Sequence, residues 1–178
     1  AFRRRFIGAS PLFYLTIASL VVPSIIVSLG IGVLFQQIGI RPVWFGSGFG
    51  AHLTWTLPFG VLIMFAVFNR FSPSYEEAAR DLGASPWQTF WHVLLPMIAP
   101  SLIGVGLFGF SLSYDEFARS LLTMGTYNTL PLEIYGMTTN VTTPVLYALG
   151  TVTTLFSFLI IGGTVGLIAL ISRKRQSA

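Results

Sequence analysis

Four long apolar runs constrain the fold of this chain more than any other feature of its sequence. They cover residues 11–38, 50–69, 94–113 and 144–171, and a helix needs about 20 residues to cross the roughly 30 Å hydrocarbon layer of a bilayer. The runs are continuously apolar, whereas the strands of a membrane barrel alternate over about ten residues. The sequence therefore predicts an all-α, polytopic bundle of four membrane spans.

The composition also indicates lipid as the surrounding solvent. Apolar residue types make up 53% of the chain and charged types only 9%, against about 25% charged residues in ordinary soluble domains. So few charges cannot cover a soluble core of this size. Nucleic-acid binding is disfavoured as well, because every basic cluster flanks a predicted span.

The basic residues are distributed unevenly about the predicted spans. Eight of the ten lie before the first span, after the second and after the fourth. Because basic residues are enriched in cytoplasmic loops, both termini and the segment between the second and third spans are predicted to be cytoplasmic. The two remaining residues, Arg41 and Arg119, are predicted to face outward. The eight are Arg3, Arg4, Arg5, Arg70, Arg80, Arg173, Lys174 and Arg175.

The segment 72–93, between the second and third spans, carries a clear signal for the start of a helix. Ser74 and Glu77 have the spacing of a capping box, and Ser72 before Pro73 offers an alternative start. Acidic residues follow in the first turn, where the helix dipole favours them. A short helix is therefore predicted here.

The same segment also carries a stop signal and a second start. Gly83 is placed to end the first helix in a left-handed conformation. Ser85, Pro86 and Gln88 then supply a cap, a first helical proline and a capping-box glutamine. Pro96 is predicted to mark the change from this second helix to the third span.

The stretch 77–96, most of which lies in segment 72–93, resembles the signature of a known family. It follows the pattern Glu-Ala-Ala, three residues, Gly, nine residues, Ile, one residue, Leu-Pro, with Val93 in place of the isoleucine. This pattern marks the permeases of binding-protein-dependent ATP-binding-cassette importers. The later stretches FSLSYDEFARSLL and YNTLPLEIYGM resemble the second permease of spermidine/putrescine importers. The matching residues of the signature are Glu77, Ala78, Ala79, Gly83, Leu95 and Pro96.

The resemblance implies a role for the loop and a set of partners. The loop would be a coupling helix that inserts into a separate ATPase and converts its closure on ATP into opening of the transport path. ATP and Mg²⁺ would be bound by that ATPase, and the other implied partners are a second permease and an extracytoplasmic solute-binding protein. The implied coupling residues are Glu77, Ala78, Ala79, Leu82, Gly83 and Pro96.

The resemblance also implies a location and a larger domain. Such permeases are multi-pass proteins of the bacterial inner membrane, usually with six spans. Residues 1–178, which begin without a Met, are therefore expected to form a single permease domain that holds the third to sixth spans and lacks the earlier ones.

No residue pattern in the sequence indicates catalysis, a cofactor or a metal. The one lysine, Lys174, is outside any phosphate-binding loop, and His52 and His92 are predicted at opposite faces of the membrane. The chain is therefore predicted not to be an enzyme. The formal dinucleotide pattern at 104–109 lies inside an apolar span and is interpreted as helix packing. The glycines interpreted in this way are Gly30, Gly104, Gly106, Gly109, Gly162 and Gly166.

Prolines interrupt three of the apolar runs, at Pro23, Pro58 and Pro100. A proline in a span frees a backbone carbonyl that must be satisfied inside the bundle or by a water-lined path. Simple kinking for packing is the favoured interpretation, and lining of a transport path is the alternative.

Acidic residues end the third span, and two interpretations of them stand level. Asp115 can pair with Arg119 one helical turn later, as at an ordinary charged helix end. Ionised groups near lipid otherwise face a cavity or a pathway, where rings can offer a face to an ammonium group. The candidate path residues are Tyr114, Asp115, Glu116 and Trp55.

The resemblance suggests a polyamine as the cargo. The alternatives are an importer of another small solute and, less favoured, a channel or a secondary transporter. The last two are disfavoured because the spans contain no lysine or arginine and essentially no buried acid except near Asp115.

Overall fold

The computed structural model describes residues 7–140 and 144–176, and these residues form helices, turns and loops without any strand. Two of the helical elements, η1 and η2, are single π-helical turns that lead into longer α-helices. The predicted all-α class is confirmed. The elements are α1 (Ala9–Ala18), α2 (Ser24–Gln37), η1 (Trp44–Gly48), α3 (Phe49–Asn69), α4 (Ser74–Asp81), α5 (Pro86–Thr89), η2 (Phe90–Leu94), α6 (Leu95–Tyr114), α7 (Leu130–Asn140) and α8 (Pro144–Gln176).

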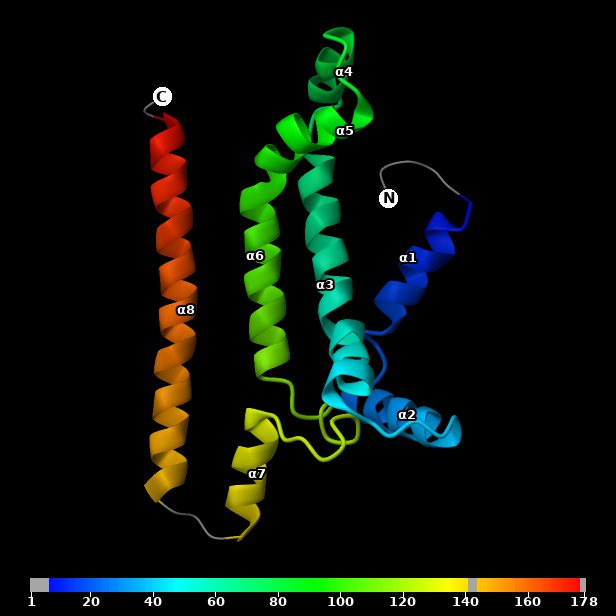
Figure 1. Ribbon diagram of the computed structural model, residues 1–178, viewed down its shortest axis with the longest axis vertical. Helices are drawn as coiled ribbons and strands as arrows, with labels where there is room; N and C mark the ends of the chain where they lie inside the picture. Colours follow the sequence, from blue (N-terminus) through cyan, green and yellow to red (C-terminus); the bar gives the residue numbers. More distant parts are fainter. Residues whose placement is uncertain (1–6, 141–143, 177–178) are drawn as a thin grey trace.

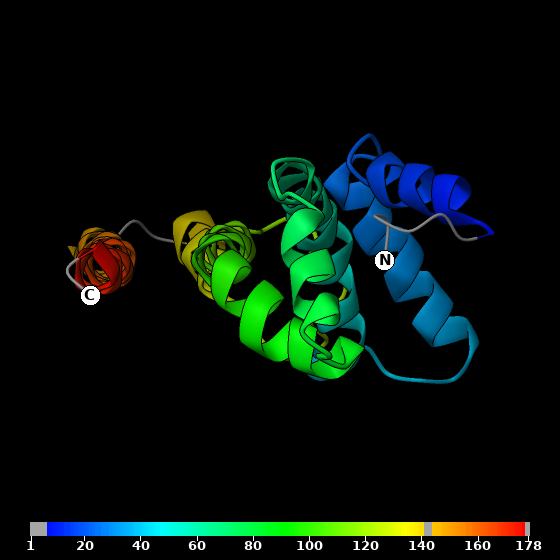
Figure 2. The ribbon, with the colours of Figure 1, turned by 90° about the horizontal axis from the view of Figure 1, so that it is seen from above.

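Helices α3 and α6 form the centre of the molecule. They lie side by side and antiparallel (Figure 1) and share the most extensive packing between any two elements of the described chain. Phe59 and Phe108 meet edge to face with ring centroids 5.6 Å apart, and a Cβ atom at Gly60 would lie 3.3 Å from Val105 Cγ1. Helix α8 stands apart from this pair (Figure 2) and approaches α6 through Tyr114 and Phe156, whose centroids are 6.4 Å apart.

Three helices of the described chain are long and apolar enough to cross a membrane. They cover Trp44–Asn69, Pro86–Tyr114 and Pro144–Gly166, with 26, 29 and 23 residues. They correspond to the second, third and fourth apolar runs. Their large apolar side chains are mostly exposed in the single chain, as expected for helices that contact lipid or another membrane protein.

The first apolar run, 11–38, is not the continuous span that the sequence predicts. It forms α1 and α2, of 10 and 14 residues, and the two helices point in different directions (Figure 1). Pro23 has no N–H to donate and takes an extended conformation, with φ −54° and ψ 132°. The turn is also held from outside, because Ser19 Oγ donates to the Thr54 carbonyl at 2.7 Å.

The prolines inside α3 and α6 act differently from Pro23. Both helices continue through Pro58 and Pro100. Pro58 cannot donate to the Thr54 carbonyl four residues earlier, and that carbonyl is the one to which Ser19 donates. The freed carbonyl is therefore satisfied within the fold, which is what a proline in a membrane helix requires.

Pro96 lies at the start of α6, where the sequence predicts the change from the second short helix to the third span. Helix α5 runs through η2 into α6 without a break, and the chain bends at η2 (Figure 1). The Leu95 N–H donates to the Phe90 carbonyl five residues earlier, the spacing of a π-turn. Pro96 follows directly after this π-turn and has no N–H to continue the hydrogen-bond ladder.

Most of the glycines predicted to be packing points between helices face open space in the single chain. The packing interpretation is therefore wrong for helix contacts within this chain. No atom lies within 4 Å of a Cβ placed at five of the six, and at Gly109 the Thr56 Cβ is 3.9 Å away. Close approaches occur instead at Gly32, Gly48, Gly60 and Gly125. The five open positions are Gly30, Gly104, Gly106, Gly162 and Gly166.

The interior of this chain is more polar than its surface. Only three hydrophobic side chains of the described residues are buried, against six polar or charged ones. Five of these six belong to one cluster, near the ends of α3 and α6 that lie away from α4. They are Ser28, Ser47, Arg119, Ser120 and Thr123.

Candidate functional site

The segment predicted to couple the chain to an ATPase forms a helical hairpin, α4–α5, at one end of the molecule. The C-terminal end of α8 lies at the same end, and the 115–129 segment and α2 lie at the other (Figure 1). The structure thus separates the two regions that the sequence predicts on opposite sides of the membrane. The assignment of each end to the cytoplasm or the exterior stays a prediction.

Helix α4 begins at the alternative start and not at the Ser74–Glu77 capping box. Ser72 Oγ accepts the Ser74 N–H at 3.3 Å, and α4 has no capping hydrogen bond from its N-cap residue, Pro73. The Ser74–Glu77 prediction is therefore wrong, because Ser74 is already inside the helix. Glu76 and Glu77 still occupy the first turn, where the dipole favours a negative charge.

The predicted stop at Gly83 and the predicted start at Ser85 are both confirmed. Gly83 has φ +83°, and the Gly83 and Ala84 N–H groups donate to the carbonyls of Arg80 and Ala79 at 2.8 and 3.0 Å. These two bonds make a Schellman motif. In the capping box of α5, Ser85 Oγ accepts from Gln88 N at 3.3 Å and Ser85 N donates to Gln88 Oε1 at 2.8 Å.

The hairpin presents apolar side chains without cover. Leu82 is 90% exposed and Trp87 is 69% exposed. Of the predicted coupling residues, Glu77, Ala78 and Leu82 are exposed and Ala79 is partly covered. Pro96 lies apart from them, at the start of α6. The arrangement offers a docking surface of small and apolar side chains.

At the opposite end, the non-helical segment 115–129 packs against α2, η1 and α3. The approach is so close that a Cβ atom at any of three glycines would require neighbouring atoms to shift. A Cβ atom at Gly32 would lie 2.7 Å from the Leu122 carbonyl oxygen, and one at Gly48 would lie 2.6 Å from Met124 Sδ. Gly125 has φ +67° and faces the Pro42 carbonyl.

Arg119 is fully buried in this region, although the sequence predicts that it faces outward. Its Nε donates to Ser24 Oγ at 3.2 Å, its Nη1 donates to Thr54 Oγ1, and its Nη2 lies 3.4 Å from the Ser19 carbonyl oxygen. The guanidinium carbon also lies 5.0 Å from the centroid of Trp55, a cation–π distance.

The predicted Asp115–Arg119 pair does not form. Helix α6 ends at Tyr114, so residues 115–119 lack the helical geometry that brings side chains at i and i+4 together. No carboxylate of the described residues makes an ion pair with Arg119. Burial lowers the pKa of the Arg119 guanidinium and the nearby Glu116 opposes this shift, but a guanidinium stays charged at any working pH.

His52 links the end of α6 to the buried segment. Its Nδ1 lies 2.8 Å from Ser113 Oγ and its Nε2 lies 2.9 Å from Ser120 Oγ. Ser120 Oγ donates to the Glu116 carbonyl at 2.7 Å, so it accepts from Nε2–H, and Nδ1 is left to accept from Ser113. A neutral imidazole therefore satisfies both contacts.

Two buried serines bind the backbone of the same segment. Ser28 Oγ donates to the Arg119 carbonyl and accepts the Leu122 N–H, both at 3.1 Å. Ser47 Oγ lies 2.6 Å from the Thr123 carbonyl oxygen and donates to it. Sequence reasoning assigned no function to these residues, and the one available signal is the recurrence of serine at positions 19, 24 and 28 of an apolar run.

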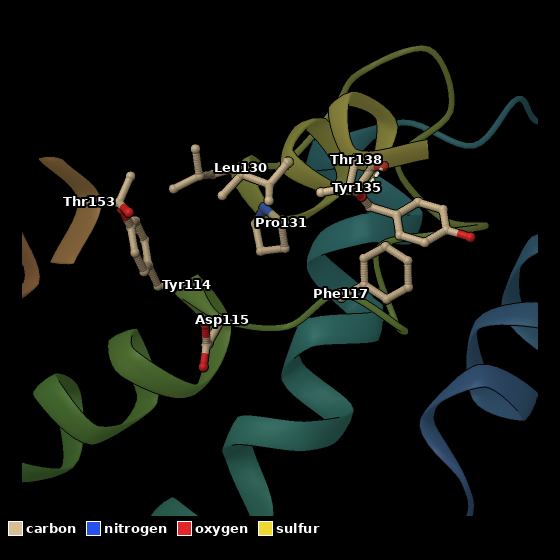
Figure 3. Close-up of a pocket in the computed structure, with 9 residues that line it drawn as sticks. Tyr114, Asp115, Phe117, Leu130, Pro131, Tyr135, Thr138 and Thr153 are labelled. Carbon is tan, nitrogen blue, oxygen red and sulfur yellow. Dashed lines mark hydrogen bonds between the residues drawn. The ribbon is translucent and has the colours of Figure 1, made fainter. Parts of the chain in front are cut away.

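A cavity of about 410 Å³ lies where α6, α7 and α8 meet. Figure 3 shows Tyr114 beside Thr153 of α8, and Phe117 beneath Tyr135 of α7. The Phe117 and Tyr135 centroids are 5.0 Å apart. Asp115 also lines the cavity. Rings, hydroxyls and one carboxylate give a lining that suits an organic cation.

The structure divides the four candidate path residues into two pairs. Tyr114 and Asp115 line the cavity, whereas Trp55 and Glu116 lie with Arg119. Glu116 Oε1 accepts the Arg119 backbone N–H at 2.9 Å. The Asp115 carboxylate makes no hydrogen bond or ion pair with another residue in the described part of the chain. In those same residues, no three His, Cys, Asp or Glu side chains gather as a metal site would require.

Comparison with known proteins agrees with these features. The spermidine/putrescine transport system permease protein PotC of Haemophilus influenzae is 31% identical over 176 residues, which cover 98% of this chain and 66% of that protein. PotC of Escherichia coli K12 is 30% identical over 161 residues, covering 90% and 61%. The putrescine transport system permease protein PotI of the same strain is 28% identical over 179 residues, covering 94% and 59%.

The chain thus spans less than two thirds of the length of these relatives. The family described as binding-protein-dependent transport system inner membrane component matches residues 1–175. This match confirms the resemblance carried by residues 77–96. The chain belongs to this family of inner membrane transport components.

Proposed function

We propose that this chain is part of the permease subunit of an ATP-driven importer for polyamines. The relatives named above are permease proteins of spermidine/putrescine and putrescine transport systems, and three apolar helices of spanning length support a membrane path. The other components would be a second permease, an extracytoplasmic binding protein and an ATPase that binds ATP and Mg²⁺.

The α4–α5 hairpin is proposed as the contact with the ATPase. The observation that carries this proposal is that two local motifs fix the hairpin, the Schellman motif at Gly83 and the capping box at Ser85. These bonds fix the shape of a surface on which Leu82 is 90% exposed. A rigid projection can transmit a movement of its partner into α3 and α6, because η2 joins the hairpin to α6 without a break.

Tyr114 and Asp115 are proposed as path residues for a cationic cargo. The free carboxylate of Asp115 supplies charge compensation, and the ring of Tyr114 offers a face to an ammonium group. Phe117 and Tyr135, which the sequence did not single out, extend the aromatic lining. Glu116 and Trp55 contribute indirectly, through their contacts with Arg119.

The test uses membrane vesicles that contain the full-length permease with its second permease, ATPase and binding protein. Radiolabelled spermidine and putrescine should enter in a saturable way that requires both ATP and the binding protein. Vesicles without the binding protein are the control. Uptake of neither polyamine, with ATP-dependent uptake of another solute, would reject the substrate. Uptake without ATP or the binding protein would indicate a channel or a secondary transporter.

A further inference from the structure

One buried guanidinium joins three segments that are remote in sequence. Arg119 contacts Ser19 and Ser24 at the α1–α2 turn, and Thr54 and Trp55 of α3. We propose that Arg119 is a positioning residue of the transport path, which holds the end of α6 so that Tyr114 and Asp115 line the cavity. This inference rests on the proposed function, because it takes that cavity to be part of the path.

The contacts of Arg119 fix the relative positions of the segments that it joins, and they do not form an ordinary stabilising ion pair. Burial of a charge is costly unless it is paired, and an apolar side chain of similar volume often serves stability as well or better. The Arg119 guanidinium makes no ion pair with a carboxylate of the described residues, and the Glu116 carboxylate accepts only from the Arg119 backbone N–H. The planar guanidinium instead contacts three neutral oxygens, of Ser19, Ser24 and Thr54. Because the N–H donors of a guanidinium have fixed directions, these three contacts define the position of the Arg119 side chain. The oxygen of Ser19 lies just beyond the C-terminal end of α1, where the helix dipole favours a cation.

The position of Arg119 is transmitted to Asp115 through a rigid turn. The Glu116 carboxylate accepts the Arg119 N–H, and Ser120 Oγ donates to the Glu116 carbonyl. His52 then connects Ser120 back to Ser113 in the last turn of α6. Tyr114 and Asp115 lie between these two attachment points.

The orientation of Asp115 depends on these hydrogen bonds, because its own side chain has no partner in the described part of the chain. Its backbone N–H is bonded to carbonyls of the last turn of α6, with Ser111 at 3.3 Å. The direction of the carboxylate is therefore determined by where α6 ends and how the following turn is held. Arg119 acts on the path through the backbone and not by contact with cargo.

A double-mutant cycle separates this positioning role from a general structural one. Arg119→Met, Asp115→Asn and the double variant are compared in the complete importer, with uptake per ATP hydrolysed as the measure. Each single variant should lower this ratio about tenfold, because a misplacement of about 1 Å costs up to about a hundredfold in well-oriented sites. The double variant should be no worse than Asp115→Asn, because the two residues act through one geometry.

Loss of folded protein would lower uptake and ATP hydrolysis together and leave their ratio unchanged. An unchanged ratio in Arg119→Met, or a roughly hundredfold loss in the double variant, would overturn the proposal.

A milder pair of variants tests the same role if Arg119→Met does not reach the membrane. Thr54→Val removes the hydroxyl that accepts from Nη1, whereas Thr56→Val removes one that bonds only within α3. Thr54→Val should lower the ratio about threefold and Thr56→Val should not. Equal effects of the two would contradict the inference.

Hydrogen exchange gives an independent readout that does not require any cargo. In Arg119→Met, the amides of residues 117–124 should exchange faster, while those in the middle of α6 should not change. Unchanged exchange at 117–124 would overturn the positioning role. If the wild-type importer takes up no polyamine but Arg119→Met still speeds amide exchange at 117–124, the proposed cargo is wrong. The role of Arg119 in holding the end of α6 is then still supported.

Discussion

The two ends of this molecule are built in different ways. The α4–α5 hairpin is shaped by contacts between near neighbours in sequence, at Gly83 and at Ser85. The Arg119 end is shaped by hydrogen bonds between residues 35 to 100 positions apart. The hairpin exposes its apolar groups, whereas the Arg119 end buries its polar ones. A docking surface needs a fixed shape on the outside, and a transport path needs fixed geometry on the inside.

The largest expected difference between the two ends is the side of the membrane to which they are exposed. Single cysteines near Arg41 and Thr126 should react with an impermeant reagent added outside, because the basic clusters predict that end to be external. Cysteines near Arg80 and Lys174 should react only after the membrane is opened. The reverse labelling pattern would reject the topology.

Gly83→Val should abolish coupled transport. Gly83 has φ +83°, a conformation that a β-branched residue adopts only with strain, so the hairpin would lose its shape. We expect normal membrane levels, loss of polyamine uptake, and ATPase activity that no longer responds to loaded binding protein. Ala79→Trp should act similarly, because the proposed close contact between the hairpin and the ATPase cannot absorb the added volume.

Gly39→Val is the matched control for this experiment. Gly39 also has a positive φ of 74° and open space around it, but it follows α2 at the other end of the molecule. The backbone strain is of the same kind, of order 1–3 kcal/mol, while the proposed ATPase contact is untouched. Equal loss of uptake in Gly39→Val and Gly83→Val would show that strain alone is responsible, and would remove the argument for coupling.

Prediction from sequence succeeded where local signals determine the structure. The apolar runs that become α3, α6 and α8, the stop at Gly83 and the cap at Ser85 all depend on residues close to one another in the chain. Composition and periodicity report such features directly.

The features that sequence missed depend on distant contacts. Pro23 ends a helix while Pro58 and Pro100 do not, and the difference lies in what surrounds each proline. Arg119 resembled an outward-facing charge because nothing near it in sequence shows that Ser24 and Thr54 would enclose it. Likewise, Asp115 and Glu116 are adjacent in sequence but lie in different surroundings.

Gly32→Val should disturb the Arg119 end by a smaller amount. A Cβ atom at Gly32 would lie 2.7 Å from the Leu122 carbonyl oxygen, so segment 115–129 must move, at a cost of about 1–3 kcal/mol. Thermal unfolding of the purified complex should begin at a lower temperature. Gly30→Val, in the same helix but with open space, is the control. Equal destabilisation by the two variants would contradict the close docking of segment 115–129.

Ser85→Ala tests how far the hairpin depends on its capping box. The change removes the oxygen that accepts from Gln88 N, and loss of such a cap costs about 1 kcal/mol. Uptake should fall only about two- to threefold, because the Schellman motif at Gly83 remains. Hydrogen exchange should be faster at residues 86–89 and unchanged at 74–81. Faster exchange across both helices would show that the hairpin is a single cooperative unit.

The smallest effect is expected from the ion pair on the surface of α4. Arg80 Nη2 lies 3.5 Å from Glu76 Oε2, and the Arg80 side chain is half exposed. Exposed pairs of this spacing contribute about 0.3–0.5 kcal/mol, less than the cap at Ser85. Arg80→Gln should therefore leave exchange in α4 and the maximal uptake rate nearly unchanged, since the shape of the hairpin comes from its caps and its left-handed glycine. Raising the salt concentration on the wild-type importer provides the matched measurement, because salt screens exposed charges. A large loss of uptake in Arg80→Gln without any change in exchange would mean that Arg80 contacts the ATPase itself, and the docking surface would then extend from Leu82 to the charged side of α4.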